Sequence, residues 1–363
     1  MRTKKPFRTS LMRVILSNNY KKILNFQAGG VMCHLPEFFN RVQIEYWKTG
    51  FQIMEKKIYN KIKISNKPKG RAGKREELTA YLCLIPAFLG VTFISYIPTI
   101  AVFVLSFFNW NGLSAPKFAG LENYIKIFTK DIYFTSSIRA TLEYAFFAVI
   151  GAVVYSLFIA ILLNMNIKGR TLFRSIFFIP YLLPAIGVFK GWQWLYEGNF
   201  GLFNFVLRML GLPPQRFLDS PSQVIICLVV IAVWTSGNLI VIFLAGLQNV
   251  PGVYVEAAKI DGANAVQRFW YITIPSIAPI IFYNVLTALI THLQVINPAL
   301  ALTNGGPGKR SMFMSYVIYL YGFQKNKIGY AAAYAVIFFF IVGIFTMVLF
   351  KTQKNTLFGE GDD

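Results

Sequence analysis

The chain has 363 residues, of which 55% are apolar and only 14% charged. This composition excludes an ordinary soluble domain, in which about a quarter of the residues are charged. The formal net charge of +21 would suit a nucleic-acid binder, but the charge is concentrated at one end. Residues 1–80 hold 18 of the 36 Lys and Arg residues and five acids, and most other basic residues flank apolar runs. Because no nucleic-acid-binding motif accompanies them, we expect no nucleic-acid partner.

Residues 1–79 are basic and contain no apolar run long enough for the core of a signal peptide. We expect a poorly ordered cytoplasmic leader that is attracted to anionic lipid. A second interpretation places the start at Met54, which opens a short basic leader of its own. Both interpretations remain open on the sequence.

Six apolar runs long enough to cross a bilayer follow the leader, and the sequence therefore predicts an all-α polytopic membrane protein with six transmembrane helices. The runs lie near residues 81–108, 141–163, 176–196, 224–247, 277–296 and 330–350. The third run ends in the aromatic residues Trp192, Trp194 and Tyr196, which are typical of a membrane interface. The segment 201–207 after it has the pattern of an interfacial amphipathic turn.

An even number of spans puts both termini on one side of the membrane. The basic leader and the loop 164–175, which has Lys168, Arg170 and Arg174 but no acid, place that side in the cytoplasm. One loop opposes this assignment, since residues 297–328 are also basic and parity puts them outside. We give more weight to parity, because late loops bias orientation less, and we expect a multi-pass protein of the cell membrane with cytoplasmic termini.

A polar loop between the fourth and fifth runs carries the pattern most informative about function. Pro251 suits the first turn of a helix, and Gly262 suits a helix end that needs a positive φ. Asn264 followed by Gln267 is the pattern of a capping box, which starts a second helix. Two short helices that meet at a glycine elbow, on a loop too polar for lipid, predict a docking surface for a soluble partner.

The same loop resembles the EAA loop of type-I ABC importer permeases. The matching residues are Glu256, Ala257, Ala258, Asp261, Gly262, Ala263, Phe269, Ile272, Ile274 and Pro275, and Ile274 is the one departure, since leucine is commoner there. The resemblance covers about residues 78–352. Segments around Phe177–Pro180, Leu302–Pro307 and Gly329–Ala333 are similar to the sugar-uptake branch related to the maltose and glycerol-phosphate permeases.

This resemblance implies a domain layout and a set of partners. Residues 80–136 would hold the first transmembrane helix and an external loop, residues 137–351 the core permease domain with the coupling loop, and residues 352–363 a cytoplasmic tail. The implied partners are an ABC ATPase dimer, a second permease subunit of different sequence, an extracytoplasmic solute-binding protein and a sugar.

The resemblance also implies roles for the loop residues. Glu256 would pair with a basic group of the ATPase, while Ala257 and Ala258 are small enough for close approach, and Ala263 belongs to the same coupling motif. Gly262 would allow the bend, and Asp261 would hold it by accepting backbone hydrogen bonds.

No catalytic, cofactor or metal motif appears in the sequence, so we expect no enzyme activity. The glycine-rich segment 305–309 fails the P-loop pattern because Thr303 stands where a glycine is needed, and His34 and His292 belong to no triad. The three cysteines lack metal-binding spacing. We therefore expect ATP to be hydrolysed by a partner subunit.

Polar side chains inside the apolar runs are candidates for a substrate path, because such groups face a bundle interior or a cavity. They are Asn238, Asn284, Thr287, Thr291 and Gln294, and the last four fall on one helical stripe. Neutral hydroxyl and amide groups suit an uncharged sugar. The alternative for each residue is an interhelical hydrogen bond that only holds the bundle together.

Two rival functions remain. An ion-coupled secondary transporter would need titratable groups in its spans and an internal repeat, and the sequence shows Glu143, His292 and no repeat. A membrane scaffold without transport is the second rival, and the polar stripe argues against it.

Overall fold

The computed structural model describes residues 71–166 and 168–357, and the chain divides into two compact units, residues 1–87 and 88–363. Residues 71–87 of the first unit belong to α3 (Arg71–Val91). The predicted leader lies outside the described residues as far as residue 70. The predicted tail is helical as far as Leu357, and residues 358–363 also lie outside the described part.

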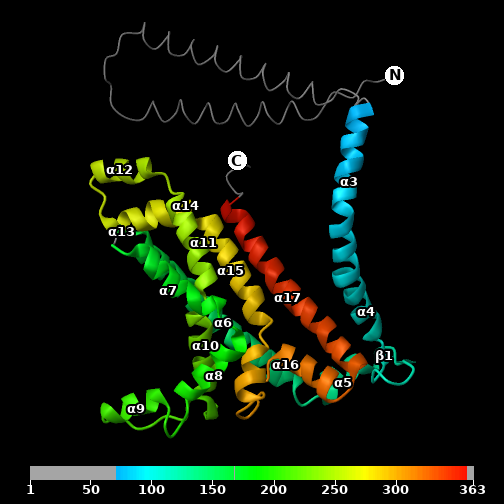
Figure 1. Ribbon diagram of the computed structural model, residues 1–363. Coiled ribbons are helices and arrows are strands. Elements are labelled where there is room, and N and C mark those ends of the chain that lie inside the picture. Colours follow the sequence, from blue (N-terminus) through cyan, green and yellow to red (C-terminus); the bar gives the residue numbers. More distant parts are fainter. Residues whose placement is uncertain (1–70, 167, 358–363) are drawn as a thin grey trace. The chain divides into compact units, whose positions relative to one another are not determined.

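The regular secondary structure in the described part of the second unit is helical apart from one small antiparallel sheet, in which β1 (Phe108–Asn109) pairs with β2 (Lys117–Phe118) (Figure 1). The α-helices are α4 (Ile97–Leu105), α5 (Glu122–Lys130), α6 (Phe134–Asn164), α7 (Arg170–Leu182), α8 (Ala185–Leu195), α9 (Leu202–Met209), α10 (Val224–Trp234), α11 (Gly237–Gln248), α12 (Gly252–Ile260), α13 (Ala265–Arg268), α14 (Ile274–Ser276), α15 (Ala278–Leu293), α16 (Met314–Tyr319) and α17 (Ile328–Leu357). The other turns of helix are η1 (Thr92–Tyr96), η2 (Phe217–Asp219), η3 (Phe269–Thr273), η4 (Ala299–Thr303) and η5 (Leu320–Gln324). The predicted all-α fold is confirmed.

Candidate membrane spans within the described residues are of two kinds. Three are helical throughout, at Leu78–Leu105, Phe134–Asn164 and Ile328–Thr352. Three others are bent pairs: α7 with α8 at 97°, α10 with α11 at 48°, and the segment Ala265–Ser276 with α15 at 69°. If each bent pair crosses once, these six segments coincide with the six predicted runs.

Two of the bends interrupt runs that the sequence predicted as continuous. The α7–α8 break falls at Leu183, whose backbone is extended because the following Pro184 disfavours helical geometry before it. The α10–α11 break falls at Ser236, where the Ser156 Oγ of α6 lies 2.9 Å from the Ser236 Oγ. A hydrogen bond from a neighbouring helix thus lies at the second break.

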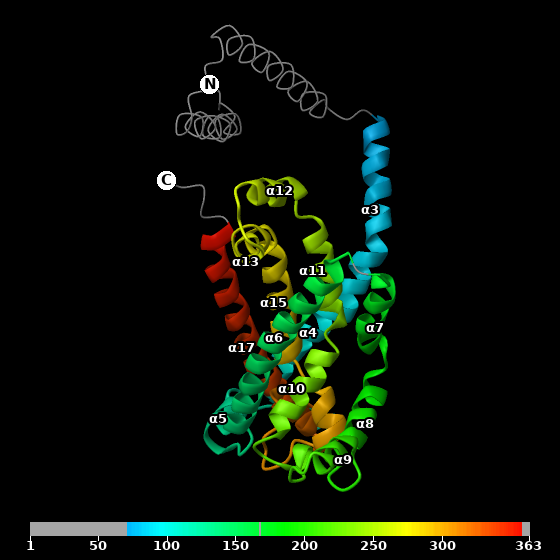
Figure 2. The same cartoon turned by 90° about the vertical axis from the view of Figure 1, so that its left-hand side faces the viewer.

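The core of the second unit is built around α6, which packs against α10, α11 and α15 (Figure 2). The buried face of α6 consists mainly of small side chains, which let helix backbones approach closely. They are Ser137, Ala140, Thr141, Ala145, Ala148, Ala152, Ser156 and Ala160. In α11, a Cβ added at Gly246 would lie 2.3 Å from the Ile280 side chain of α15, so that contact also depends on a small residue.

The basic loop 297–328, which opposed the orientation assignment, has partners inside the fold. The Arg310 Nη2 lies 2.7 Å from the Glu143 Oε1 of α6, and the Arg310 Nε donates to the Pro221 carbonyl at 3.0 Å. The ammonium groups of Lys309 and Lys325 lie 5.3 and 4.9 Å from the centre of the Tyr133 ring. These cations therefore make contacts within the fold. Their number in that loop is a weak guide to the side of the membrane on which the loop lies.

Candidate functional site

The predicted elbow between two short helices is present. α12 ends in a Schellman motif, because the Ala263 N–H donates to the Ala258 carbonyl at 2.9 Å and the Gly262 N–H donates to the Lys259 carbonyl at 3.1 Å. Gly262 has φ +81°, the left-handed conformation that this motif requires. The elbow thus joins α12 to α13, and carbonyl groups in the last turn of α12 accept hydrogen bonds from it.

The predicted capping box starts α13. The Asn264 Oδ1 accepts from the Gln267 backbone N–H at 2.8 Å, and the Gln267 Oε1 accepts from the Asn264 N–H at 2.8 Å. The Arg268 guanidinium also donates to the Ala263 carbonyl. Backbone hydrogen bonds and the Arg268 side chain therefore hold the elbow. The sequence had suggested the Asp261 carboxylate for this role.

The acidic groups of the elbow are open to solvent. Glu256 and Asp261 are exposed, and within the described residues neither carboxylate has a hydrogen bond or an ion pair. Ala257 is exposed, while Ala258 and Ala263 are half-buried. The loop therefore presents two unpaired negative charges beside small side chains, with the exposed Lys259 between them in the sequence.

Two shallow hollows flank the elbow, of about 370 and 390 Å³. Both are lined by Ala258, Asp261, Tyr271 and Ile272. Gly262 and Arg268 also line one hollow, and Tyr254 and Pro275 also line the other. The hollows lie where α12 faces the chain that returns through η3.

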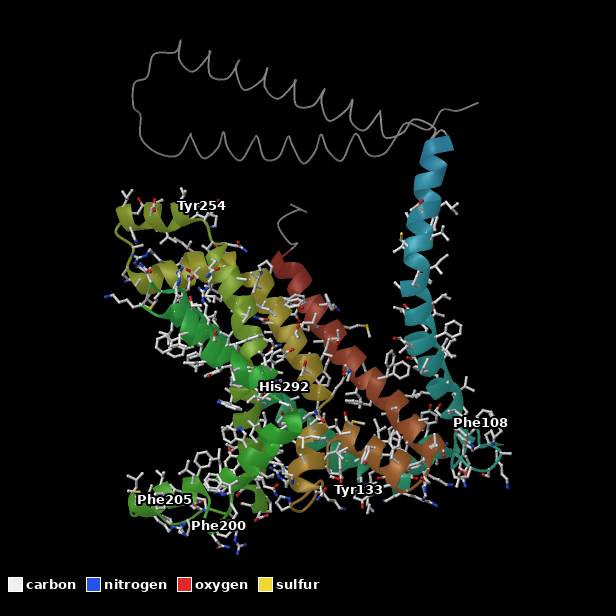
Figure 3. The ribbon with its side chains drawn as sticks, in the orientation of Figure 1. Phe108, Tyr133, Phe200, Phe205, Tyr254 and His292 are labelled. Carbon is white, nitrogen blue, oxygen red and sulfur yellow. The ribbon has the colours of Figure 1, made fainter. Side chains whose placement is uncertain are left out.

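Sequence reasoning missed the aromatic residues of this surface. Tyr254 and Tyr271 are 60% and 80% exposed, and Figure 3 shows Tyr254 on α12. Trp270 and Ile260 are 59% and 86% exposed. Aromatic side chains in a polar loop are the signal that could have identified them, because exposed aromatic groups are enriched in protein interfaces.

The predicted polar stripe divides into an open part and a buried part. Thr287 is half-buried, and Thr291 and Gln294 are exposed along one side of α15 and its end. Asn284 is fully buried, and its Nδ2 donates to the Leu239 carbonyl of α11 at 3.4 Å while its Oδ1 has no partner. Asn238 on α11 is half-buried. The arrangement thus gives Asn284 an interhelical contact and leaves Thr291 and Gln294 open.

A second polar cluster, which the sequence did not reveal, lies at the start of α6. The Asp131 Oδ2 accepts from the Tyr321 and Tyr330 hydroxyls at 2.6 and 2.8 Å, and its Oδ1 accepts from the Tyr133 N–H at 2.7 Å. Burial acts to raise the pKa of the Asp131 carboxyl, but these hydrogen bonds prevail and the pKa is lowered below its ordinary value of 3.8. Asp131 therefore ties α6 to η5 and α17 as a carboxylate.

Comparison with known proteins identifies the family. Residues 152–353 match the model of the binding-protein-dependent transport system inner membrane component. The chain is 35% identical to the probable ABC transporter permease protein YesP of Bacillus subtilis over 79% of this chain and 94% of that protein. It is 34% identical to the multiple sugar-binding transport system permease protein MsmF of Streptococcus mutans over 75% and 93% of the two chains.

A solved structure shares the fold. It is a chain of a bacterial alginate ABC transporter in complex with an alginate pentasaccharide-bound periplasmic protein, with a TM-score of 0.69 and 19% identity, over 78% of this chain and 96% of that one. The family match also decides against the ion-coupled secondary transporter. The chain belongs to the family of binding-protein-dependent transport system inner membrane components, the permease subunits of ABC importers.

Proposed function

We propose that the chain forms half of the transmembrane pathway through which an ABC importer takes up a sugar or oligosaccharide. Relatives named for transport of multiple sugars and of trehalose or maltose support the substrate class. The observation that carries the proposal is the elbow, a surface with unpaired carboxylates that is joined directly to a candidate span.

The elbow would receive force from the ATPase subunit. Glu256 would pair with a cation of that subunit, and Tyr254 and Tyr271 would fill its surface cleft. The segment from α13 to α14 continues into α15, which carries Thr287 and Thr291. A displacement of the elbow is thereby passed to the helix that lines the substrate path, and the bundle moves between two accessibilities.

The remaining assignments follow from this proposal. ATP is hydrolysed by the partner subunit, and the chain itself has no catalytic centre and needs no cofactor. A second, different permease subunit completes the pathway, an extracytoplasmic binding protein delivers the sugar, and both termini of this chain lie in the cytoplasm.

The test is reversal of the charge at the elbow. Glu256→Lys should lower sugar uptake about tenfold or more, because truncating or reversing one partner of an interfacial charge pair costs several kcal/mol. ATP hydrolysis should persist without stimulation by the loaded binding protein, at an unchanged level of permease in the membrane. Asp219→Lys makes the same charge change at an exposed residue remote from the elbow and should leave uptake intact. Normal uptake by Glu256→Lys would contradict the proposal.

A further inference from the structure

α9 is apolar on two sides. Phe203 and Leu207 are half-buried against the protein, whereas the opposite side carries Leu202, Phe205, Val206 and Met209, which are 43%, 54%, 44% and 74% exposed. Figure 3 shows Phe205 at α9, with Phe200 nearby, at the end of the bundle opposite Tyr254 of α12. A helix with this composition has no side that suits bulk water.

The orientation of α9 is fixed from within. Asn204 is fully buried, and its Nδ2 donates to the carbonyls of Gly198 and Gln215, each at 2.8 Å, while its Oδ1 accepts from the Gln215 N–H at 2.8 Å. The Phe203 ring lies 5.1 Å from the Tyr196 ring. Because these contacts hold the inward side, the outward apolar side cannot turn into the protein core.

The position of α9 in the chain indicates what covers its outward side. Only residues 196–201 separate it from α8, the second half of a candidate span. Trp194 in the last turn of α8 is 56% exposed, and tryptophan and tyrosine mark the level of the membrane interface. The outward side therefore continues the exposed apolar surface at the end of a candidate span.

Charge points to the same partner. Between residues 202 and 212 Arg208 is the one charged residue, and it is exposed at the edge of the apolar side. A cation beside an apolar stripe suits a helix that lies in the headgroup region, with its apolar side toward the acyl chains and its cation at the phosphates.

We propose that α9 is an interfacial anchor, which lies in the bilayer surface opposite the elbow and binds phospholipid through Leu202, Phe205, Val206 and Met209. It holds the end of α8 at a fixed depth, so that movement of α7 is taken up at the Leu183 break, where α7 and α8 meet at 97°.

Spin labelling of the assembled importer tests this proposal. Single cysteines replace Phe205, Met209 or Arg208 in a variant without the native Cys33, Cys83 and Cys227, and nitroxide-labelled complexes are placed in nanodiscs of phosphatidylethanolamine and phosphatidylglycerol. At 205 and 209 accessibility to oxygen should exceed accessibility to a water-soluble nickel chelate severalfold, and at 208 the ratio should shift toward nickel. Greater nickel accessibility at 205 and 209 would show a water-facing side, and protection from both reagents would show a protein partner; either result overturns the proposal.

A second measurement avoids the cysteine substitutions. Benzoylphenylalanine at Phe205 in the otherwise native chain should form covalent adducts with phospholipid on irradiation. Adducts with another polypeptide, or none with lipid, overturn the proposal. Glu256→Lys serves as a control, because it disrupts coupling and should leave the lipid adducts unchanged, so the anchor and the coupling function are judged separately.

Discussion

Gly262 occupies a left-handed backbone conformation at φ +81°, which costs an L-residue about 1–2 kcal/mol. Gly262→Ala should therefore distort the elbow and lower uptake severalfold, although a Cβ there would meet no neighbouring atom. Gly252→Ala is the matched control, since Gly252 lies in α12 with ordinary backbone geometry and open space for a Cβ. Transport assays with membrane levels held equal check the pair, and equal uptake by the two variants would contradict the role of the elbow.

Asp131 predicts a dependence of stability on pH. Its pKa is lower in the folded protein than its ordinary 3.8, so the carboxylate stabilises the fold above that value, and this contribution is lost as the pH falls through the lower, folded pKa. Asp131→Asn should lower stability at pH 7 by about 1–3 kcal/mol, the usual effect of weakening hydrogen bonds to a charged group. The difference from the native protein should shrink once the pH falls below 3.8.

Thermal unfolding of the purified permease between pH 7 and 3 measures this effect. Asp219→Asn is the control, because Asp219 is exposed and its carboxylate has no hydrogen bond among the described residues. A melting temperature of Asp131→Asn equal to that of the native protein at pH 7 would contradict the account.

The open and buried parts of the polar stripe should respond differently to substitution. Thr291→Val keeps the shape of an exposed side chain and removes only its hydroxyl, so we expect lower uptake with an unchanged melting temperature. Asn284→Ala removes a buried contact to α11 and should lower stability by about 1–3 kcal/mol. Sugar uptake and thermal unfolding, measured on both variants, distinguish a residue of the substrate path from a structural contact. A lower melting temperature of Thr291→Val would contradict the assignment of Thr291 to the substrate path.

At the scale of residues, the sequence predicted what depends on neighbours along the chain. Gly262, Asn264 and Gln267 act within one turn of helix, and their roles in the elbow and the capping box are confirmed. Asp131 finds its partners about 190 and 199 positions away, at Tyr321 and Tyr330. A single sequence carries no signal for such pairs.

At the scale of elements, α17 depends on a close contact with β1. A Cβ added at Gly329 would lie 1.9 Å from the Phe108 carbonyl oxygen, and that backbone cannot move aside without disturbing the sheet. Gly329→Ala should destabilise the protein by about 1–3 kcal/mol or more, as overpacking does. Gly343→Ala in the same helix meets no atom within 4 Å and should be tolerated. Thermal unfolding of the two variants measures the difference in stability, and similar melting temperatures would contradict the packing of α17 on β1.

The helix breaks show which features of the helices can be predicted from the sequence and which cannot. The apolar runs located each candidate span found in residues 71–166 and 168–357, because apolar length is a property of local sequence. Pro184 was a readable signal for the α7–α8 break. The break at Ser236 is associated with Ser156, 80 positions away, and the contact depends on the packing of α6 against α10 and α11.

At the scale of the molecule, the elbow and α9 lie at opposite ends of the second unit. The elbow at one end continues through α14 into α15, and the proposed lipid anchor α9 holds the other end beside α8. Movement at the elbow can then change the arrangement of the helices in the bundle, while the unit as a whole keeps its depth in the membrane. The central claim is that an ATPase subunit occupies the hollows lined by Tyr254 and Tyr271.

Photo-crosslinking in native membranes tests that claim most directly. Benzoylphenylalanine at Tyr254 or Tyr271 should capture a nucleotide-hydrolysing subunit, with a yield that changes when ATP is bound. The same probe at Leu113, which is 91% exposed in the loop between β1 and β2, should not capture that subunit. Capture of the ATPase at Tyr254 and Tyr271 is the result predicted here, and its absence at both positions in a complex that transports normally would contradict the account.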